Sequence, residues 1–584
     1  MRKTWRPRAV PPPPECLSDW ANRLSVSPRL AGLLWNRGLT SVVDMDVFLC
    51  PGLRHLMPPS ALPGLTRAAE AVAGVLAAGE SLVVWGDYDV DGVTATALLL
   101  DFFARRGYTA RHYIPARLEE GYGLNVQGLE ILKASGADMV LTVDSGITAV
   151  REAERALELG LKLVITDHHL PGPELPRAMA LANPKLGETD GPGRDLAGVG
   201  VAFFLAAALN RMLPGESIDI RQFLDLAALG TLADVVSLTG QNRILVKNGL
   251  LLLAEASRPG IFALKEAAGY YPKAPLEATQ VTFGLAPRIN AAGRLNRADE
   301  ALALLLTPDL ETARPLARTL DDLNVKRRQE EDAISSEAQA QAQAQAGQPA
   351  MVLSAPHWHQ GVIGIVASRV VDIHYRPTLI ITADNGRLKG SGRSIPEVDL
   401  HAALESCQDL LLGFGGHHQA AGFSLAPENL NALTEAFRKA VALQLGDAAP
   451  TPTLRIDGEL SFADIHQELL KELALIGPFG CGNPEPVFSS IPLDVKARRV
   501  FGANHVVLEV RDPDAQVTLR AKAWRMAGEI GPEVQGKKLT LAFTPKLDTY
   551  NGLCSVELRV KDWCGGAVSA EPVGPFPDGK KKNS

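Results

Sequence analysis

The stretch that decides the fold is VVWGDYDVDGVTATALLL, residues 83–100, where an apolar run leads through three closely spaced aspartates into an apolar helical pattern. The aspartates are Asp87, Asp89 and Asp91, and no Lys or Arg lies within residues 81–104 to neutralise them. Carboxylates this close repel one another and are costly to keep ionised unless cations or solvent surround them. The stretch therefore predicts a strand that ends in an acidic cluster, followed by a helix.

Strand-like and helical patterns alternate from about residue 80 to residue 260. The strand-like runs are SLVVWG, RHYIP, MVLTVD, LKLVITD and MALANP. This alternation is typical of a parallel α/β sheet, whose functional groups gather at the carboxyl ends of its strands. We expect further strand ends to bring Asp144 (in VDSG), Asp167, His168 and His169 (in DHH), and Asp234 (in ADVV) to the aspartate cluster.

This set of residues predicts a metal site. Oxygen ligands joined by an imidazole suit Mn²⁺ or Mg²⁺ better than a structural zinc site, which would use sulfur. Two such ions clamp a phosphoryl group and generate a hydroxide nucleophile. Taken singly, each motif has a simpler reading: the aspartates as a solvated or calcium-like turn, and the histidine pair as surface or core residues.

Composition restricts the class of protein. A chain of 584 residues suits three or four domains, and 46% apolar with 21% charged residues is ordinary for a globular protein. No apolar run reaches the 18 or so residues of a membrane span, and MRKTWRPRAVPPPPE has no signal-peptide core, so we expect a cytoplasmic protein. Six scattered cysteines without a C-x-x-C pair indicate neither a disulfide framework nor a zinc knuckle.

The formal net charge of −7 argues mildly against a nucleic-acid partner, but the charge is unevenly distributed. Residues 493–563 contain 12 Lys and Arg against 9 Asp and Glu, in strand-like runs that predict a small β-barrel. Aromatic residues lie among these charges, at Phe501, Trp524 and Tyr550. Such a barrel can bind single strands, although alternating basic residues are also the ordinary wet face of a sheet.

Between these regions the sequence predicts a long helix and a second α/β domain. Residues 315–346 are rich in helix formers, with Pro315 expected in the first turn and Gly347 as a stop. Their alternating Ala-Gln tail has no wide apolar stripe, which favours a solvated connecting helix. Strand-like and helical runs then alternate again to about residue 445.

The motifs GDYDVDG, VDSG, DHH and ADVV, in this order, resemble those of the DHH phosphoesterase superfamily. The segments FGLAPRINAAGRL, WHQGVIGIVASR, GSGRS and GFGGHHQAAG resemble the bacterial RecJ family of exonucleases within it, over roughly residues 20 to 565. The resemblance implies two α/β domains with parallel-type sheets, joined by a long helix and followed by an OB-fold barrel. The implied segments are an N-terminal helical extension (1–75), a DHH catalytic domain (76–308), a connecting helix (309–347), a DHHA1 nucleic-acid-binding domain (348–447), an OB-fold (448–565) and a disordered tail (566–584).

The resemblance also implies roles at the metal site. Asp89, Asp91 and His168 would be ligands, Asp87 a ligand or a supporting group, Asp144 a bridge between two ions, and Asp234 a ligand of the second ion. His169 would face the scissile phosphate, with Asp167 orienting the histidine pair. Asp144, Asp167, His168 and His169 are therefore the expected catalytic residues.

Further residues are implied to hold the substrate. Arg117, Ser391 and Arg393 would form a pocket for a 5′ phosphate, although Arg117 could equally form a salt bridge with Glu119 or Glu120. The DNA backbone would be gripped by Arg288, Asn290, Arg294, His359 and Arg369, and by Gly415, Gly416 and His417 of the glycine-rich motif. Trp358 could stack on a base, but burial is the better expectation.

The resemblance implies a metal-dependent 5′→3′ exonuclease that is specific for single-stranded DNA and releases 5′ mononucleotides in DNA repair and recombination. Expected partners are a single-strand-binding protein and a helicase, and we expect a monomer. Two alternatives stay open at this point. One is a DHH phosphodiesterase acting on short RNA or cyclic dinucleotides, which would not need the basic barrel; the other is an inactive DNA-binding replication factor, which would need broken metal motifs.

Overall fold

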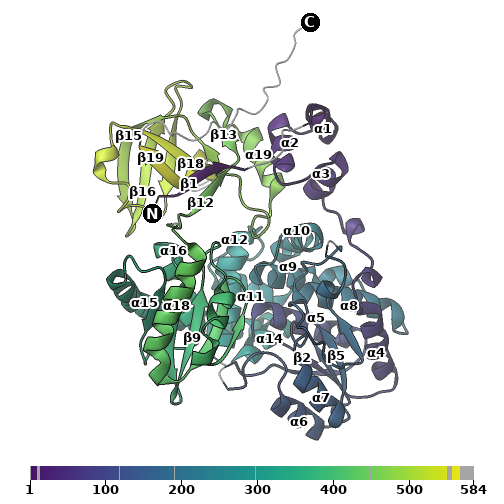
Figure 1. Cartoon of the computed structure of the whole chain (residues 1–584). Coiled ribbons are helices and arrows are strands. Elements are labelled where there is room, and N and C mark those ends of the chain that lie inside the picture. The colour runs from purple at the N-terminus through teal and green to yellow at the C-terminus, as the bar shows by residue number, and fades with distance from the viewer. Residues whose placement is uncertain are drawn as a thin grey trace. The chain divides into compact units, whose positions relative to one another are not determined.

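The computed structural model describes residues 2–8, 14–117, 119–189, 191–295, 297–447, 449–548 and 555–565. Tyr550 and the expected tail lie outside these residues. The chain forms two compact units (Figure 1). The first comprises Met57–Val236 and Asn248–Thr451, and the second comprises Arg2–Leu56, Ser237–Lys247 and the residues from Pro452 onwards.

The first unit is built on a five-stranded parallel sheet in the order β3-β2-β4-β5-β6. Its strands are β2 (Leu82–Trp85), β3 (Ala110–Tyr113), β4 (Met139–Thr142), β5 (Lys162–Thr166) and β6 (Ala180–Ala182). The central strands β2 and β4 are buried along their whole length, as expected for a sheet covered on both faces. In this doubly wound order, the chain reverses direction across the sheet between β2 and β4, where such sheets form their binding sites.

Helices cover both faces of this sheet (Figure 1). One layer contains α4 (Leu65–Ala77), α5 (Val90–Arg105) and α8 (Gly198–Met212); the other contains α6 (Val126–Ala134) and α7 (Val150–Glu158). Against this layer pack α9 (Leu224–Ala233), α13 (Ala286–Arg294) and α14 (Ala298–Leu306), and α11 (Pro259–Ala267) contacts α14. The unit also contains α12 (Ala278–Gln280) and the part of α10 (Gly240–Glu255) from Asn248 onwards. These elements place the ends of β2, β4 and β5 beside the first turns of α5 and α8.

The long helix is α15 (Leu310–Ala344), which lies within the implied segment 309–347 and begins earlier than the helix-forming pattern of residues 315–346 indicates. Its N-cap is Asp309, whose carboxylate accepts from the backbone N–H of Thr312 at 2.8 Å, so Pro315 lies inside the helix and not in its first turn. The prediction of a solvated Ala-Gln tail is wrong as well. Ala338 and Ala342 are fully buried against the second sheet, because alanines four residues apart share one face of the helix.

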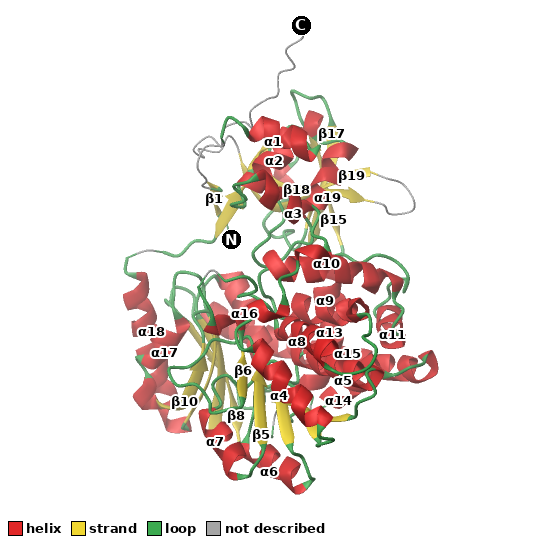
Figure 2. Ribbon diagram, turned by 90° about the vertical axis from the view of Figure 1, so that its right-hand side faces the viewer, coloured by secondary structure: helices red, strands yellow, loops and turns green. Residues whose placement is uncertain are grey.

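The second sheet of this unit is mixed, in the order β10-β11-β9-β8-β7, and only β7 and β8 run parallel. Its elements are β7 (Met351–Ser354), α16 (Ile363–His374), β8 (Thr378–Asp384), β9 (Arg387–Arg393), α17 (Leu400–Glu405), β10 (Leu411–Gly416), β11 (Ala420–Leu425) and α18 (Leu430–Leu445). Helices α15 and α16 cover one face, while α17 and α18 cover the other. Figure 2 shows these helices from a second side.

The second unit contains a closed ring of five strands, joined in the order β18-β15-β16-β17-β19 and back to β18. The strands are β15 (Leu493–Phe501), β16 (His505–Arg511), β17 (Thr518–Ala523), β18 (Lys538–Asp548) and β19 (Ser555–Gly565), and only β17 and β19 pair in parallel. This is the OB-fold arrangement. The expected architecture of two α/β domains, a long helix and a terminal barrel is confirmed.

The N-terminal segment belongs to the barrel's unit. Strand β1 (Thr4–Pro7) pairs in parallel with β12 (Thr453–Ile456). Helices α1 (Leu17–Leu24), α2 (Pro28–Trp35), α3 (Val42–Leu49) and α19 (Gln467–Ile476) share one apolar core with the barrel strands (Figure 2). Short strands β13 (Gly458–Glu459) and β14 (Phe488–Ser489) extend the sheet. Among the described residues, no helix is both long and apolar enough to cross a bilayer.

Candidate active site

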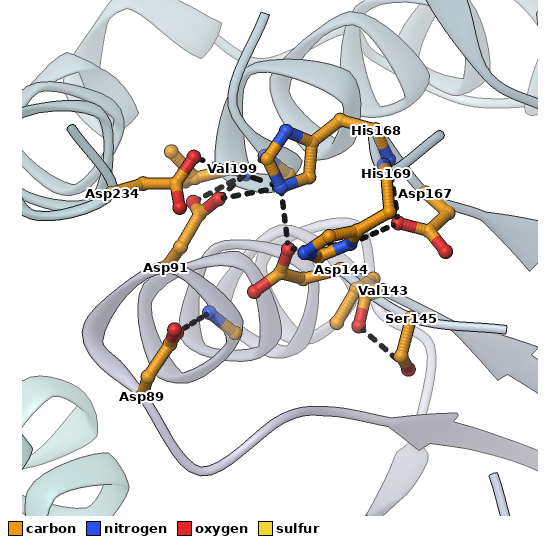
Figure 3. A network of polar contacts seen from close by, with 12 residues as sticks. Asp89, Asp91, Val143, Asp144, Ser145, Asp167, His168, His169, Val199 and Asp234 are labelled. Carbon is orange, nitrogen blue, oxygen red and sulfur yellow. Dashed lines mark hydrogen bonds and ion pairs between the residues drawn. The ribbon is translucent and has the colours of Figure 1, made fainter. Parts of the chain in front are cut away.

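The ends of three neighbouring strands meet at one acidic centre (Figure 3). Asp89 is the N-cap of α5, with its carboxylate accepting from Gly92 N at 3.1 Å. Asp144 follows β4 with a left-handed backbone (φ 59°), a conformation that Asp tolerates better than most residues. His168 follows β5, and its Nε2 lies 3.0 Å from the Asp144 carboxylate.

Three overlapping sets of side chains in this centre have donor atoms close enough to hold a cation, and within each set these atoms lie within 4.8 Å of one another. The sets are Asp87, Asp89 and Asp144; Asp91, His168 and Asp234; and Asp144, His168 and His169, of which the first two share no residue. Buried atoms of four of these residues have no hydrogen-bond partner among the described residues: Asp87 Oδ1, Asp144 Oδ1, His168 Nε2 and Asp234 Oδ2. Such unpaired donor atoms fit a pair of hard divalent cations such as Mn²⁺ or Mg²⁺.

Asp234 lies at the acidic centre, but the element that carries it differs from the expected one. It is not at a strand end: it is the C-cap of α9, which packs against α5, and its carboxylate lies 3.6 Å from His168 Nε2. The next residue, Val235, has a positive φ of 62°, so the helix ends abruptly there. The sequence prediction was correct about the place and wrong about the element.

Burial and mutual repulsion hold several of these carboxyls toward their neutral forms in the protein without metal. Burial, followed by the charge of Asp89, raises the pKa of Asp91 to about 7. Burial, followed by the charge of Asp91, raises the pKa of Asp234 to about 9. The pKa values of Asp87 and Asp144 are raised for the same reasons. The cluster therefore needs compensating positive charge before all its carboxylates can ionise together.

The two neighbouring histidines have opposite electrostatic environments. Burial and the nearby His169 lower the pKa of His168 to about 3, which keeps its imidazole neutral, as a metal ligand must be. Burial, the largest single effect, acts to lower the pKa of His169, but the hydrogen bond from Nδ1 to Asp167 at 2.8 Å and the charges of the nearby carboxylates together raise it. Asp167 also accepts from Ile147 N at 2.9 Å and from the backbone N–H of both histidines, so it orients the pair.

Helix α8 supports the centre through a glycine that the sequence analysis did not single out. The Asp91 carboxylate accepts from the backbone N–H groups of Gly198 at 2.6 Å and Val199 at 2.8 Å, in the first turn of that helix. A Cβ atom on Gly198 would lie 2.7 Å from Asp144 Cβ and 2.8 Å from Asp144 Oδ1. Glycine is therefore required for α8 to approach both carboxylates. Sequence alone offers no sign of this beyond the GVGV pattern.

Three arginines form a basic pocket in the same unit. Arg393 donates to Ser391 Oγ at 3.1 Å and Arg294 donates to Gly361 O at 2.6 Å, while the Arg117 guanidinium lies 4.8 Å above the ring of Tyr88. Burial, followed by the like charge of Arg117, lowers the pKa of Arg393, and burial followed by Arg117 lowers that of Arg294 to about 10. No carboxylate among the described residues forms an ion pair with these three side chains.

Gathering like charges costs free energy, so this pocket is suited to an anion. Arg393 and Ser391 border the first turn of α16, because a Cβ on Gly364 would meet Arg393 Nη2 and Ser391 Oγ at 3.0 Å each. The backbone N–H groups of a helix N-terminus also favour anions. Glu120, one expected alternative partner of Arg117, instead accepts from Tyr113 and from Ala116 N.

Two arginines expected to grip DNA are engaged elsewhere, which corrects their predicted role. Arg288 pairs with Asp321 of α15 at 2.8 Å. Arg369 pairs with Glu331 at 2.7 Å and Asp332 at 2.8 Å, also on α15. Both side chains therefore tie neighbouring elements to the long helix.

The other residues expected to hold substrate lie nearer the site. Asn290 Oδ1 accepts from Val90 N at 3.2 Å and supports the first turn of α5. His359 Nδ1 accepts from Gly361 N at 3.1 Å, beside Arg294. Trp358 is buried and donates to Glu337, as the better expectation had it.

The hairpin of the second sheet that carries Gly415, Gly416 and His417 lies near the acidic centre. Gly415 and Gly416 end β10, and His417 N donates to Ala420 O at 2.8 Å to close the turn. The pKa of His417 is lowered by burial and then by the charges of His169 and Lys185. Lys185 is a half-buried lysine that the sequence analysis missed, close to Asp167 and Asp234.

Comparisons with known proteins agree with this arrangement. Three family models match in chain order: the DHH family N-terminal domain over residues 81–231, the DHHA1 domain over 347–443 and the RecJ OB domain over 456–562. The single-stranded-DNA-specific exonuclease RecJ of Bacillus subtilis is 36% identical, over 94% of this chain and 70% of the relative. The Escherichia coli protein of the same name is 34% identical, over 91% and 95%.

Solved structures give the same result. The crystal structure of RecJ in complex with Mn²⁺ from Thermus thermophilus matches with a TM-score of 0.82 and 33% identity, covering 97% of this chain and 80% of that one. Its complex with Mg²⁺ matches with a TM-score of 0.77 and 32% identity, covering 97% and 79%. The three domain models and the relatives that align along nearly the whole chain show that it belongs to the RecJ family.

Proposed function

We propose that this protein is an exonuclease specific for single-stranded DNA, which removes 5′ mononucleotides in the 5′→3′ direction and uses Mn²⁺ or Mg²⁺. The observation that carries the proposal is the presence, in one compact unit, of two distinct sites. One is the carboxylate and histidine centre, and the other is the pocket of Arg117, Arg294 and Arg393. The RecJ relatives, which are named as single-stranded-DNA-specific exonucleases, support the same function.

The side chains of the acidic centre have separate tasks in this proposal. Asp87, Asp89 and Asp144 hold one divalent cation, and Asp91, His168 and Asp234 hold the other. Together the bound cations supply a water of lowered pKa and neutralise charge that develops on the reacting phosphate. His169, held by Asp167 through Nδ1, presents Nε2 to a phosphate oxygen and donates a proton to a hydrogen bond there.

The basic pocket gives the enzyme its direction. A terminal phosphate has more free oxygens and more negative charge than an internal phosphodiester, so clustered guanidinium groups prefer it. Hydrolysis that breaks the P–O3′ bond releases a nucleotide with a 3′ hydroxyl. The shortened strand then carries a new 5′ phosphate, and the same pocket selects it again.

Polarity is tested with the variant Arg393→Ala on oligonucleotides with a 5′ phosphate or a 5′ hydroxyl. Loss of a charged hydrogen-bond donor costs about 1.5–3 kcal/mol, so the preference for the phosphorylated end should fall by about 10- to 100-fold. Affinity for Mn²⁺, measured by calorimetry, should not change. Arg369→Ala is the matched control, since Arg369 pairs with α15. An undiminished preference in Arg393→Ala would place the end-binding site elsewhere.

Substrate class is tested by comparing single-stranded DNA, duplex DNA, short RNA and cyclic dinucleotides at equal concentration. The proposal predicts that single-stranded DNA is degraded fastest. Faster hydrolysis of short RNA or cyclic dinucleotides would instead support the phosphodiesterase. Binding without hydrolysis in the presence of Mn²⁺ would support the inactive replication factor.

The barrel supports a role in holding the strand. Trp524 is 47% exposed and forms an aromatic cluster with Phe501 and His505, and base stacking on such residues is tolerant of sequence. Two basic residues of the barrel already form ion pairs: Lys522 contacts Glu557, and Lys546 contacts Glu485.

The cell would require a source of single strands for this activity. We therefore extend the proposal to the cytoplasm, to DNA repair and recombination, to a helicase and a single-strand-binding protein as partners, and to a monomeric enzyme. The domain limits expected from the sequence belong to the same proposal, as do the expected residue roles other than those of Arg288 and Arg369.

A further inference from the structure

Tyr122 is an exposed aromatic side chain held beside the candidate catalytic histidine. Its side chain is among the exposed large apolar groups, with 53% of the residue surface accessible. Its hydroxyl is nevertheless anchored, since it donates to the main-chain carbonyl of Asp144 at 3.2 Å and lies 3.2 Å from His169 Nδ1. The ring therefore borders the reaction centre with a surface that the protein leaves uncovered.

The local chain is built to present this ring. Gly121 and Gly123 flank Tyr122, and both have positive φ values, 89° and 76°. A residue with a side chain rarely adopts such conformations, so the Gly-Tyr-Gly sequence allows a sharp double turn with the tyrosine at its tip.

Tyr122 continues into a row of ring contacts that leads to the basic pocket. Its ring centroid lies 5.8 Å from that of His169 on one side and 6.4 Å from that of Tyr88 on the other, both edge-on. The Arg117 guanidinium lies 4.8 Å above the ring of Tyr88. Two tyrosines therefore fill the interval between the basic pocket and the acidic centre.

A nucleotide bound at both sites must cross this interval. If the terminal phosphate lies at Arg117 and the next phosphodiester lies at His169, the sugar and base of one nucleotide remain between them. Aromatic side chains stack on any base, because every base has a π face. They are therefore suited to an enzyme that removes nucleotides without regard to sequence.

We propose that Tyr88 and Tyr122 form the binding surface for the sugar and base of the 5′-terminal nucleotide. This inference rests on the proposed function and adds to it the subsite that lies between end recognition and hydrolysis. The nucleotide that they bind is then the one that hydrolysis releases.

The test compares two 5′-phosphorylated single-stranded oligonucleotides that differ only in the terminal residue, which is either a normal nucleotide or an abasic tetrahydrofuran. For the unaltered protein with Mn²⁺, we expect the abasic end to lower kcat/KM by about 10- to 100-fold, the usual worth of one base stacked on an aromatic ring. In Tyr122→Leu the two substrates should differ by less than about threefold, because the stacking surface is gone. Tyr122→Phe keeps the ring and should keep the preference.

Tyr271→Leu serves as a control, because Tyr271 is another exposed tyrosine, 75% accessible, outside the site. It should retain the unaltered protein's preference for the normal end. The proposal is overturned if the unaltered protein does not distinguish the two ends, or if Tyr122→Leu keeps the full preference. Failure of the unaltered protein to degrade either oligonucleotide would instead overturn the proposed function.

A binding measurement covers the case in which Tyr122→Leu does not fold. With the unaltered protein in the presence of chelator, an oligonucleotide with a 5′-terminal 2-aminopurine should lose fluorescence on binding, because stacking quenches this base. A 2-aminopurine several residues further into the strand provides the reference. Bound oligonucleotide whose terminal 2-aminopurine is no more quenched than this reference would contradict the proposal.

Discussion

At the scale of single residues, the acidic centre depends on how closely the backbone of α8 approaches two carboxylates. Gly198 donates its N–H to Asp91 and leaves no room for a Cβ beside Asp144. One glycine therefore positions residues assigned to both cation sites. The neighbouring side chains are buried and closely packed, so they leave no free space into which Asp144 could move.

Gly198→Ala should consequently reduce activity more than it reduces stability. The new methyl group forces Asp144 or α8 to shift, and a displacement of about 1 Å at a catalytic group can lower kcat about 100-fold. Overpacking of this kind costs about 1–3 kcal/mol of stability. Single-turnover rates and urea unfolding measure the two effects. Activity equal to that of the unaltered protein would show that the approach of α8 to Asp144 is not critical.

The raised carboxyl pKa values predict how metal-free protein responds to pH. Asp91 and Asp234 hold protons in the folded state up to about pH 7 and 9, whereas unfolded Asp loses its proton near pH 4. The folded state therefore binds more protons over this interval, so the free energy of unfolding should fall as pH rises. Mn²⁺ requires the ionised ligands and should stabilise the protein more at about pH 8 than at about pH 6.

Thermal unfolding with chelator or with Mn²⁺ across this pH range tests the prediction. Asp234→Asn removes one of the two groups and should flatten the pH dependence of the chelated protein. A chelated protein whose unfolding temperature rises steadily from about pH 5 to about pH 9 would contradict the assigned protonation states.

Individual residues also show where sequence analysis reaches its limit. The aspartates and histidines could be placed because three of their motifs follow recognisable strands. Arg288 and Arg369 have the same chemistry as Arg117 and Arg393, and only their ion pairs with α15 distinguish them. Such pairs join distant parts of the chain, so no local pattern reveals them.

At the scale of elements, the Ala-Gln repeat of α15 protects the edge of the second sheet. Strand β7 is an edge strand, and its free side is covered by two glutamine side chains. Gln341 exchanges two hydrogen bonds of 3.0 Å with the backbone of Ser354, and Gln345 exchanges bonds of 3.1 and 2.8 Å with that of Val352. The amide groups act in place of a sixth strand and leave no open edge there for another chain to pair with.

Replacing Gln341 and Gln345 together by Leu should destabilise the second sheet and expose this edge. Each amide makes two hydrogen bonds worth about 0.5–1.5 kcal/mol, so a loss of about 2–6 kcal/mol is expected. Urea unfolding and light scattering measure stability and self-association. Gln343→Leu is the matched control, because Gln343 is exposed on the same helix. A double variant as stable and monodisperse as this control would show that the bonds contribute nothing.

The sequence predicts a helix or strand correctly where the pattern of apolar and turn residues lies within that element and at its ends. The five parallel strands and the five strands of the barrel follow alternating apolar runs bounded by turn residues, and they form as expected. The ADVV motif looks like another strand end, yet Asp234 ends a helix, because short apolar runs fit either structure. The local pattern places the start of α15 too late, because Pro315 suggests a first turn, whereas Asp309 supplies the cap.

At the scale of the whole molecule, the two ends of the chain fold together in one unit. Thr4 pairs with Thr453, and Leu33 of α2 shares an apolar core with barrel residues such as Leu541. No sequence periodicity connects segments so far apart, so the N-terminal residues read only as a helical extension. The first unit has its own cores around its two sheets.

Leu33→Ala should therefore weaken the barrel unit. Leu33 is fully buried, and truncation of such a side chain costs about 2–5 kcal/mol. Hydrogen exchange in β15 to β19 should become faster, with β4 and β5 as the internal reference. Val43→Ala, at an exposed position of α3, should leave exchange unchanged. Unaltered protection of the barrel strands in Leu33→Ala would contradict a shared core.

In the proposed function, the acidic centre hydrolyses single-stranded DNA from its 5′ end. The most direct measurement is a time course with Mn²⁺ on single-stranded DNA labelled at either end, using the unaltered protein and Asp144→Asn. Asn tolerates the left-handed backbone at this position and removes only the charge. We expect early release of the 5′ label as a mononucleotide, with the 3′ label on progressively shorter strands, and loss of both signals in Asp144→Asn. Early release of the 3′ label, or an undiminished rate in Asp144→Asn, would contradict it.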